Sequence, residues 1–307
     1  MAIINTGLLT KGLRSEFFNR FNAATTFFQD LSTRIESRSD TETYKWLGSL
    51  PRMREWGTGR LAKGMGSESY SIENLKYEST LEVDRDEISD DKTGQIRIRI
   101  AEMAERAATH KDFLISQLLV NGETAGFNSY DGVSFFNNSH VSGSSGAQDN
   151  LVSSTAVDPD SPTTDEFKTG LKTAIGTMMD FKDDQGEPMS ISATGLVCIV
   201  PTLMYLTALE AINATIISST SNIVAGAARI IAFPWLTDQS KWYLLKTDGV
   251  IRPLIFQDRE PVEFNALTED SDEGFRREKF LYGVRARYRL AYGYWQFAVR
   301  MNFVAPV

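Results

Sequence analysis

The chain has 307 residues, of which 42% are hydrophobic and 23% charged, and this composition excludes wholesale disorder, collagen-like chains and coiled coils. Its formal net charge of −8 is unsuited to nonspecific nucleic-acid binding by the whole surface. Its one cysteine, Cys198, excludes internal disulfides and cysteine-based metal clusters and suits a reducing cytoplasm.

The charge is distributed unevenly along the chain. From Phe275 onward seven basic residues stand against one acid, Glu278, whereas the first 274 residues carry 25 basic and 39 acidic groups. Opposite charges in two parts of one chain favour contacts between its copies as much as contacts with a polyanion. We therefore expect self-association.

The N-terminal region predicts a helix rather than a targeting segment. It has no signal-peptide pattern, and no apolar run anywhere reaches the roughly 18 residues of a membrane span. Residues 11–37 space their apolar side chains as one helix face does, with Phe17, Phe21, Phe28 and Leu31 among them. We expect this helix to pack against another part of the molecule.

Two tryptophans then bracket a turn. Trp46 and Trp56 flank a Gly-Ser-Leu-Pro sequence, with no histidine, cysteine or acid cluster beside them. Four glycines within residues 57–66 disfavour a helix, and alternating apolar positions over 75–83 predict a strand. Together they predict a projecting hairpin, which needs another surface to lie on because a lone two-stranded ribbon is barely stable.

The clearest helix in the sequence is predicted over residues 95–121. Acidic residues from Asp84 to Asp91 precede it, and the pair Asn121-Gly122 ends it. Residues 142–163 read as a loop. Thr163 and Glu166 then form a capping box for a second helix.

The later part of the chain mixes strands and helices. A buried strand is predicted at 195–200, and Pro201 begins a third helix that reaches about residue 212. Further strands are predicted near 228–233, 241–246 and 250–256. The irregular order of helices and strands indicates the α+β class.

In the last strand region the alternation of polar and apolar residues changes phase. Arg285, Arg287 and Arg289 occupy odd positions, but Trp295 and the apolar residues after it also fall on odd positions. A bulge or turn near residues 292–293 resolves this conflict.

Motifs for catalysis and cofactor binding are incomplete, and we expect no catalytic residue, cofactor or metal. The glycines at 57–66 lack the Lys-Ser/Thr pair of a phosphate loop and the helix that follows a dinucleotide fingerprint. The acids at 84–91 lack the spacing of a calcium loop and suit a solvated helix start. His110 is expected to be a hydrogen-bonded core residue, whereas His140 lies in a polar loop without an obvious Cys or Ser partner. A hydrolase using two of the 40 acids stays an alternative, but no pair stands out.

The arginine row at 285, 287 and 289 has two interpretations. With Tyr288, Tyr292 and Tyr294 it resembles a platform for nucleic acid. The interpretation that we favour for an acidic chain is a strand whose outer face pairs with acids of a neighbouring subunit. The first predicts steep salt dependence of nucleic-acid binding, and the second does not.

Three stretches, YKWLGSLPRMREW, YDGVSFFNNSH and YGVRARYRLAYGYWQFA, together resemble the major head subunit family of Mu-like bacteriophages and prophages, in that family's order. The resemblance covers the chain from about residue 10 to its end. It implies the Hong Kong 97-type capsid fold and a structural protein rather than an enzyme.

That fold divides the chain into parts. The resemblance implies an N-terminal arm and lead-in at 1–56, a projecting E loop at 57–80, a peripheral domain at 81–184 and 261–307 built on the spine helix 95–121, and an axial domain at 185–260. Trp46 and Trp56 are then expected to anchor the base of the E loop, because large rigid rings supply burial at little entropic cost. Candidate contacts between subunits are Arg60, Lys63, Arg285, Arg287 and Arg289. Some relatives cross-link subunits through a lysine and an asparagine, but no partner for Lys63 matches here.

The implied function is self-assembly. Head-to-tail contacts close into hexamers and pentamers of an icosahedral shell, and many weak contacts per subunit hold it together. The implied partners are further copies of the chain, a portal, a scaffold and decoration proteins, with only weak contact to packaged double-stranded DNA and none to membranes. The shell would assemble in the bacterial cytoplasm and become the virion capsid. An encapsulin-like cellular compartment is the alternative with the same fold.

Overall fold

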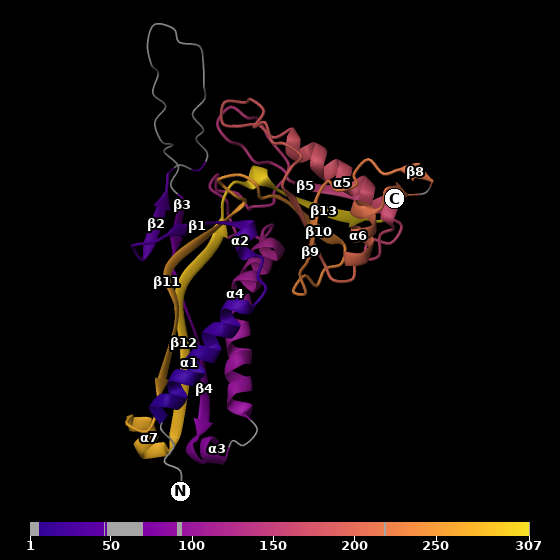
Figure 1. Cartoon of the computed structure of the whole chain (residues 1–307). Helices are drawn as coiled ribbons and strands as arrows, with labels where there is room; N and C mark the ends of the chain where they lie inside the picture. Colours follow the sequence, from indigo (N-terminus) through magenta and orange to yellow (C-terminus); the bar gives the residue numbers. More distant parts are fainter. Residues whose placement is uncertain (1–5, 46, 48–69, 91–93, 218, 307) are drawn as a thin grey trace.

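A computed structural model describes residues 6–45, 47, 70–90, 94–217 and 219–306, and two β-sheets organise them (Figure 1). The four-stranded sheet has the order β1-β11-β12-β4, and the five-stranded sheet has the order β5-β13-β10-β6-β9. Each sheet is the centre of a packed body, and the two bodies meet at the upper end of the long strands (Figure 1). Mixed helices and strands confirm the α+β class.

The four-stranded sheet is long and narrow. Its two central strands, β11 (Leu254–Leu267) and β12 (Lys279–Tyr292), are antiparallel, and β4 (Leu75–Asp84) pairs antiparallel with β12. The edge strand β1 (Ser32–Glu36) pairs parallel with the first residues of β11. Along β12 buried and partly exposed residues alternate, because one face of the sheet is covered and the other meets solvent.

Two helices cover this sheet. The helix α4 (Gln95–Asn121) runs along the body, and α1 (Thr6–Ala23) packs against it (Figure 1). Beneath them lies a small apolar core in which Phe17 contacts Phe264 at 5.2 Å between ring centres. The predicted helix over 95–121 is therefore confirmed at its expected bounds, and its first turns are helical although they alternate Ile and Arg.

Short elements close the lower end of this body. The helix α3 (Arg85–Asp90) follows β4, and α7 (Asp272–Arg277) lies in the connection from β11 to β12. The Arg85 amide donates to the Glu278 carbonyl at 2.9 Å, which holds the two connections together. We call α3, α7 and their flanking residues the foot of the molecule.

The five-stranded sheet is more deeply buried. Its strands are β5 (Leu151–Thr155), β6 (Leu196–Val200), β9 (Arg229–Ala232), β10 (Lys241–Lys246) and β13 (Ala298–Val304). Every residue of β6 is buried, which requires cover on both faces. The helices α5 (Thr164–Met179) and α6 (Tyr205–Asn213) pack beside it, and a short hairpin joins β7 (Ile216–Ile217) to β8 (Thr220–Ser221).

The phase change near 292–293 is a change of sheet. After β12 the chain turns at Gly293, passes the 3-10 helix η1 (Trp295–Phe297) and enters β13 of the other sheet. A Cβ on Gly293 would lie 2.8 Å from the Arg252 carbonyl oxygen, so the turn excludes a side chain. The predicted turn is confirmed, and it links the two bodies.

The predicted helix over 11–37 is wrong beyond its first half. The chain leaves α1 at Ala23, forms the short helix α2 (Phe28–Leu31) and then joins the long sheet as β1. The Asp112 carboxylate of α4 accepts the amides of Phe27 at 3.1 Å and Phe28 at 2.7 Å. Asp112, 84 residues from Phe28 in sequence, therefore stabilises the interruption between α1 and α2. The spacing of apolar residues within 11–37 does not indicate this interruption.

Other predictions are confirmed or corrected nearby. The capping box at Thr163 is present, and α5 follows it; strands are confirmed at β6, β9 and β10. The predicted loop over 142–163 is wrong in part because it contains β5, and the third helix begins at Tyr205 rather than Pro201.

The predicted hairpin at 57–80 extends too far at its end, because residues 75–80 belong to β4 along β12. Residues 70–73 form β3 (Tyr70–Glu73), which pairs antiparallel with β2 (Thr41–Tyr44) in a separate two-stranded sheet, as strands of a hairpin do. The alternation that predicted a projecting strand marks a strand of the body. The remainder, with Trp46 and Trp56, lies outside the described residues.

Sheet membership differs from the predicted domain limits. β5, α5 and β13 belong with the five-stranded sheet, although 81–184 and 261–307 were assigned to the peripheral part. The first residues of β11, assigned to the axial part, lie in the long sheet. The reason is continuity of hydrogen bonding, since β13 pairs with both β10 and β5 and β11 runs from Leu254 to Leu267.

Candidate assembly surfaces

A buried polar network holds β2 and β3, the strands on either side of residues 45–69, against the long sheet. The register pairs Tyr44 with Tyr70. The Tyr44 hydroxyl donates to Gln257 Oε1 at 2.6 Å, and Gln257 Nε2 donates to Asn74 Oδ1 at 2.8 Å. Gln257 is fully buried within β11, and burial raises the pKa of Tyr44 to about 12, so its hydroxyl stays a donor.

The network continues into the turn before β2. Asn74 Nδ2 donates to Ser37 Oγ at 2.8 Å and to the Ser39 carbonyl at 2.9 Å. Glu42 Oε1 accepts the amides of Arg38 at 2.7 Å and Ser39 at 3.0 Å, and these bonds lower the pKa of Glu42. The described anchors at this base are this polar network and the buried apolar side chains Leu47 and Ile72, whereas the sequence prediction named the two tryptophans, which lie outside the described residues. The signal in the sequence was Gln257, a polar residue that directly follows the apolar run 254–256.

The arginine row is paired within its own subunit. Glu260 accepts Arg285 Nη1 at 2.6 Å and Arg287 Nη1 at 3.0 Å, and Arg287 Nη2 reaches Asp40 Oδ1 at 2.6 Å. Arg289 lies beside Tyr77, to which it donates a hydrogen bond. The two candidate contacts Arg60 and Lys63 lie outside the described residues.

The tyrosines of the same region cannot form a nucleic-acid platform. Tyr288, Tyr292 and Tyr294 are 2–3% exposed, so none presents a ring face to a base. Their hydroxyls serve the interior: Tyr292 donates to the Leu118 carbonyl at 2.7 Å. Alternation on β12 placed the tyrosine rings and the arginines on opposite faces.

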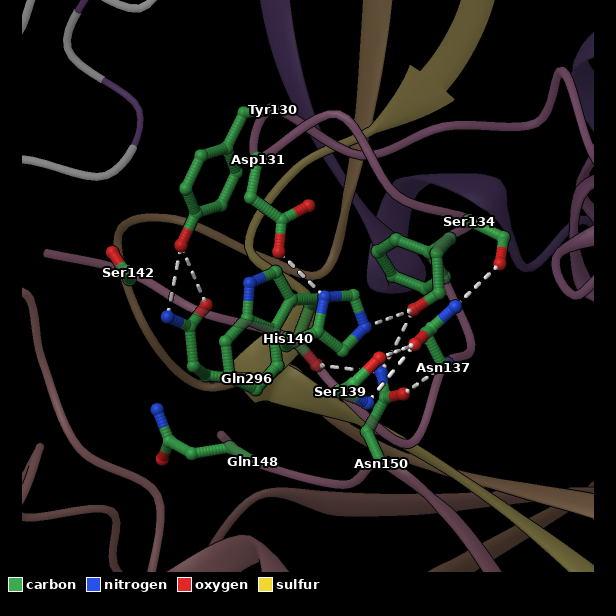
Figure 2. A network of polar contacts seen from close by, with 12 residues as sticks. Tyr130, Asp131, Ser134, Asn137, Ser139, His140, Ser142, Gln148, Asn150 and Gln296 are labelled. Atoms are coloured by element: carbon green, nitrogen blue, oxygen red, sulfur yellow. Dashed lines mark hydrogen bonds and ion pairs between the residues drawn. The ribbon is translucent and has the colours of Figure 1, made fainter. Parts of the chain in front are cut away.

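His110 and His140 both have hydrogen-bond partners. His110, partly buried, contacts the Tyr288 hydroxyl through Nδ1 at 2.7 Å, as expected for a core histidine. For His140 the sequence offered no Cys or Ser partner, and the partner that the structure shows is an aspartate: the ring is fully buried and Nδ1 lies 2.6 Å from Asp131 Oδ2 (Figure 2). Sequence spacing gave no sign of this pair, since the loop residues between them carry no regular pattern.

The His140 pair fastens a long loop to the sheet (Figure 2). Nε2 donates to the Phe135 carbonyl at 3.2 Å, and the ring stacks on Trp295 with centres 4.2 Å apart. Gln296 Nε2 donates to the Tyr130 hydroxyl at 2.9 Å. The loop between α4 and β5 is thereby fixed to the crossover that joins the two sheets, which is a structural role.

Beside α2 is a cleft of about 670 Å³ with a basic lining. Lys111 Nζ lies over the rings of Phe28 at 4.5 Å and Phe256 at 4.8 Å, and burial lowers its pKa. Arg34 pairs with Asp258 at 2.7 Å on the same wall. Cation–ring contacts of this kind stabilise the junction of α2 with the sheet.

The foot is rich in acidic side chains. Between Glu82 and Asp90 and between Glu269 and Lys279 the described residues include ten acids and four bases. Within the described ranges, no group of three His, Cys, Asp or Glu side chains is arranged to hold a metal ion. In the same ranges, none of the helices combines the length and apolarity that crossing a bilayer demands.

Several large apolar side chains are exposed. Leu203, Leu206 and Ile223, near α6 and the β7–β8 hairpin, are 72–78% exposed, and Phe275 on α7 is 88% exposed. Exposed apolar groups at the two ends of an elongated molecule mark candidate contact surfaces.

One protein family matches nearly the whole length of the chain. A family model described as "Mu-like prophage major head subunit gpT" matches residues 7–164, 163–236 and 237–303. The chain is 27% identical over 290 residues to the major capsid protein of Escherichia phage Mu, covering 94% of this chain and 70% of that protein.

Solved structures share the architecture. The procapsid of bacteriophage JBD30 matches with a TM-score of 0.60 and 23% identity, over 100% of this chain and 77% of that one. The virus-like particle from Pyrococcus furiosus matches with a TM-score of 0.56 and 12% identity, over 95% of this chain and 98% of that one.

Proposed function

Because the chain belongs to the Mu-like prophage major head subunit gpT family, we propose that its copies close head-to-tail into hexamers and pentamers of an icosahedral shell. The chain is a major capsid protein of the tailed-phage type, a structural protein of the virion rather than an enzyme. Its fold is the Hong Kong 97 type.

The observation that best supports contact with neighbouring subunits is the firm attachment of β2 and β3, which flank residues 45–69, to the long sheet. β2 and β3 leave and rejoin the long sheet as register partners, and a fully buried glutamine ties them to β11. Fixed ends restrict the positions that the segment between them can take, which reduces the entropy lost on association. We propose that this segment is the E loop and that Arg60 and Lys63 contact the adjacent subunit.

The two bodies correspond to the two domains of the fold in our proposal. The four-stranded sheet with α1 and α4 would be the arm and peripheral part, and the five-stranded sheet with α5 and α6 the axial part. Support comes from sheet membership, which separates the two bodies.

Packaged double-stranded DNA is the proposed content of the shell. The net charge of −8, the pairing of Arg285 and Arg287 with acids and the burial of the tyrosines favour weak, nonspecific contact with it. Portal, scaffold and decoration proteins are the further proposed partners, with assembly in the host cytoplasm.

A cellular compartment shell with the same fold is the second candidate. The fold is shared with the virus-like particle from Pyrococcus furiosus, but the sequence likeness to the Mu protein favours the phage head. Nucleic acid inside the particles would support the phage head, and packaged protein without nucleic acid would support the compartment.

The test is assembly of the purified chain. It is expressed alone and with its scaffold, sedimented, and the fast fraction is imaged by electron microscopy. Closed shells or ring-shaped capsomers are expected. A chain that remains monomeric in every condition contradicts the proposal.

A further inference from the structure

An apolar slot lies between α4 and the long sheet. Its volume is about 200 Å³, and its floor and walls include Met103, Ala107, Val284 and Ala286. The slot falls where the small core under α1 ends and the larger core begins, so no described side chain of the subunit fills it. An apolar cavity of about 150 Å³ accepts benzene, so this slot has room for one phenyl ring.

An exposed phenyl ring is available on the same molecule. Phe275 of α7 is 88% exposed, the most exposed aromatic side chain among the described residues. The turn that carries it is rigid: Ser271 Oγ accepts the Gly274 amide at 3.1 Å, and a Cβ on Gly274 would lie 2.4 Å from the Thr268 carbonyl oxygen. An aromatic residue held outward on a fixed turn is the usual form of an interface anchor.

The charges around the two features are complementary. Arg106 is exposed at the rim of the slot, and Asp270 is exposed beside α7; neither has an ion pair to another described residue. The foot is strongly acidic, whereas the slot is lined by Arg106, by Arg285, which Glu260 already pairs, and by one acid, Glu78. Opposite charges around an apolar anchor fix the orientation of a contact.

The ring cannot fill the slot of its own subunit. Its exposure shows that it does not, and Val284 lies five residues along β12 from Lys279, on the order of 17 Å from the foot. We propose that Phe275 of one subunit inserts into the slot of a neighbouring copy. This inference rests on the proposed shell and names one of its contacts, which joins unlike surfaces and therefore suits closed rings.

Two variants test the anchor and the slot separately. Phe275→Ala is expected to raise the concentration needed for shell assembly about tenfold or more, the effect of truncating a central anchor. Ala107→Phe places a ring in the slot from within and is expected to impair assembly equally. Thermal unfolding of each isolated subunit is the folding control, and Leu206→Ala, at another exposed apolar residue, is the matched control for assembly.

Cross-linking tests proximity. The one native cysteine, Cys198, is fully buried, so thiols can be introduced at exposed Ser79, at the slot rim, and at Arg276, beside Phe275. With Ser79→Cys and Arg276→Cys in one chain, a short bis-maleimide is expected to give covalent multimers in assembled shells but not in free subunits. Adding Phe275→Ala should abolish them, and the pair Ser79→Cys with Leu203→Cys is the control.

The outcomes separate this contact from the function. Shells that form with cross-linking no greater than the control pair overturn the inference and leave the proposed function intact. The same holds if Phe275→Ala impairs assembly while Ala107→Phe does not, because the ring then docks elsewhere, for instance on a scaffold. If the wild-type chain forms no shells, both fail.

Discussion

The two bodies of this subunit are stabilised in different ways. In the five-stranded body the central strands β6, β10 and β13 are buried on both faces, and the rings of Trp242 and Phe167 pack with their centres 4.9 Å apart. In the four-stranded body only one face is covered, and a buried glutamine, a buried aspartate and paired arginines hold strands and helices in place. A thin sheet has too little interior to depend on apolar burial alone, so specific polar contacts define its geometry. We therefore expect apolar truncations to destabilise the five-stranded body most, and the loss of polar contacts to destabilise the four-stranded body most.

The largest effect is expected in the five-stranded body. Trp242→Ala removes a fully buried ring that packs on Phe167 and should lower the free energy of unfolding by about 3–5 kcal/mol. Urea denaturation of the free subunit, followed by circular dichroism, measures the loss. Leu206→Ala, 72% exposed, is the control and should change little. A loss for Trp242→Ala no larger than for the control would show that the rings do not dominate this body.

In the four-stranded body the sharpest test is Gln257→Leu. The substitution keeps a side chain of similar size but removes the hydrogen bonds of Gln257 to Tyr44, to the Ile72 carbonyl and to Asn74, which should cost about 3 kcal/mol. The measurement is again denaturation of the free subunit. Thr43→Ala, which removes a hydroxyl from the exposed face of the same hairpin, should leave stability nearly unchanged. Equal effects of the two variants would contradict the role given to the network.

Asp112 is expected to make the free energy of unfolding depend on pH. Burial, partly opposed by the amides of Phe27 and Phe28, raises the pKa of Asp112 from 3.8 to about 6. Because the folded-state value is the higher one, the contribution of this group to stability is present below pH 4 and is lost as the pH rises through about 6. Relative to Asp112→Asn, wild type should gain about 2 kcal/mol in unfolding free energy between pH 7.5 and 4.5.

Denaturation curves of the two proteins at both pH values provide the measurement. Asp160→Asn, in an exposed loop, serves as the charge-matched control and should follow wild type. If wild type and Asp112→Asn show the same pH dependence, the carboxylate is not the titrating group at the α1–α2 break.

The smallest effect is expected at the start of α5. Thr163→Ala removes the side chain that accepts the Glu166 amide at 3.3 Å and should cost about 1 kcal/mol. Thr169→Ala, on the exposed face of the same helix, is the matched control. A cost equal to that of Trp242→Ala would mean that local capping, rather than packing, governs this body.

Sequence patterns predicted correctly those elements whose ends are determined by residues close together in the sequence. The bounds of α4 followed from its apolar stripe and its Asn-Gly end, and the start of α5 followed from Thr163 and Glu166. The turn at Gly293 followed from a conflict of phase along the sequence, but the entry of β13 into the other sheet did not. In each case the residues that decide the outcome are neighbours in sequence.

Long-range contacts account for the failures. Asp112, on the buried face of α4, interrupts a helical pattern in residues 11–37, and its position among apolar residues was the available signal. His140 is buried because Trp295 stacks on it across 155 residues, which no spacing reveals. The family resemblance supplied the function, whereas the individual contact residues required the coordinates.

The pairing of Tyr44 with Tyr70 has a consequence for variation in length. Because β2 and β3 hold Tyr44 and Tyr70 at one rung of a ladder and Leu47 is buried in the main core, residues can be added between Leu47 and Tyr70 without moving either sheet. An insertion there is expected to leave the folding of the subunit unchanged and to act on assembly, since the same stretch contains the proposed contacts Arg60 and Lys63.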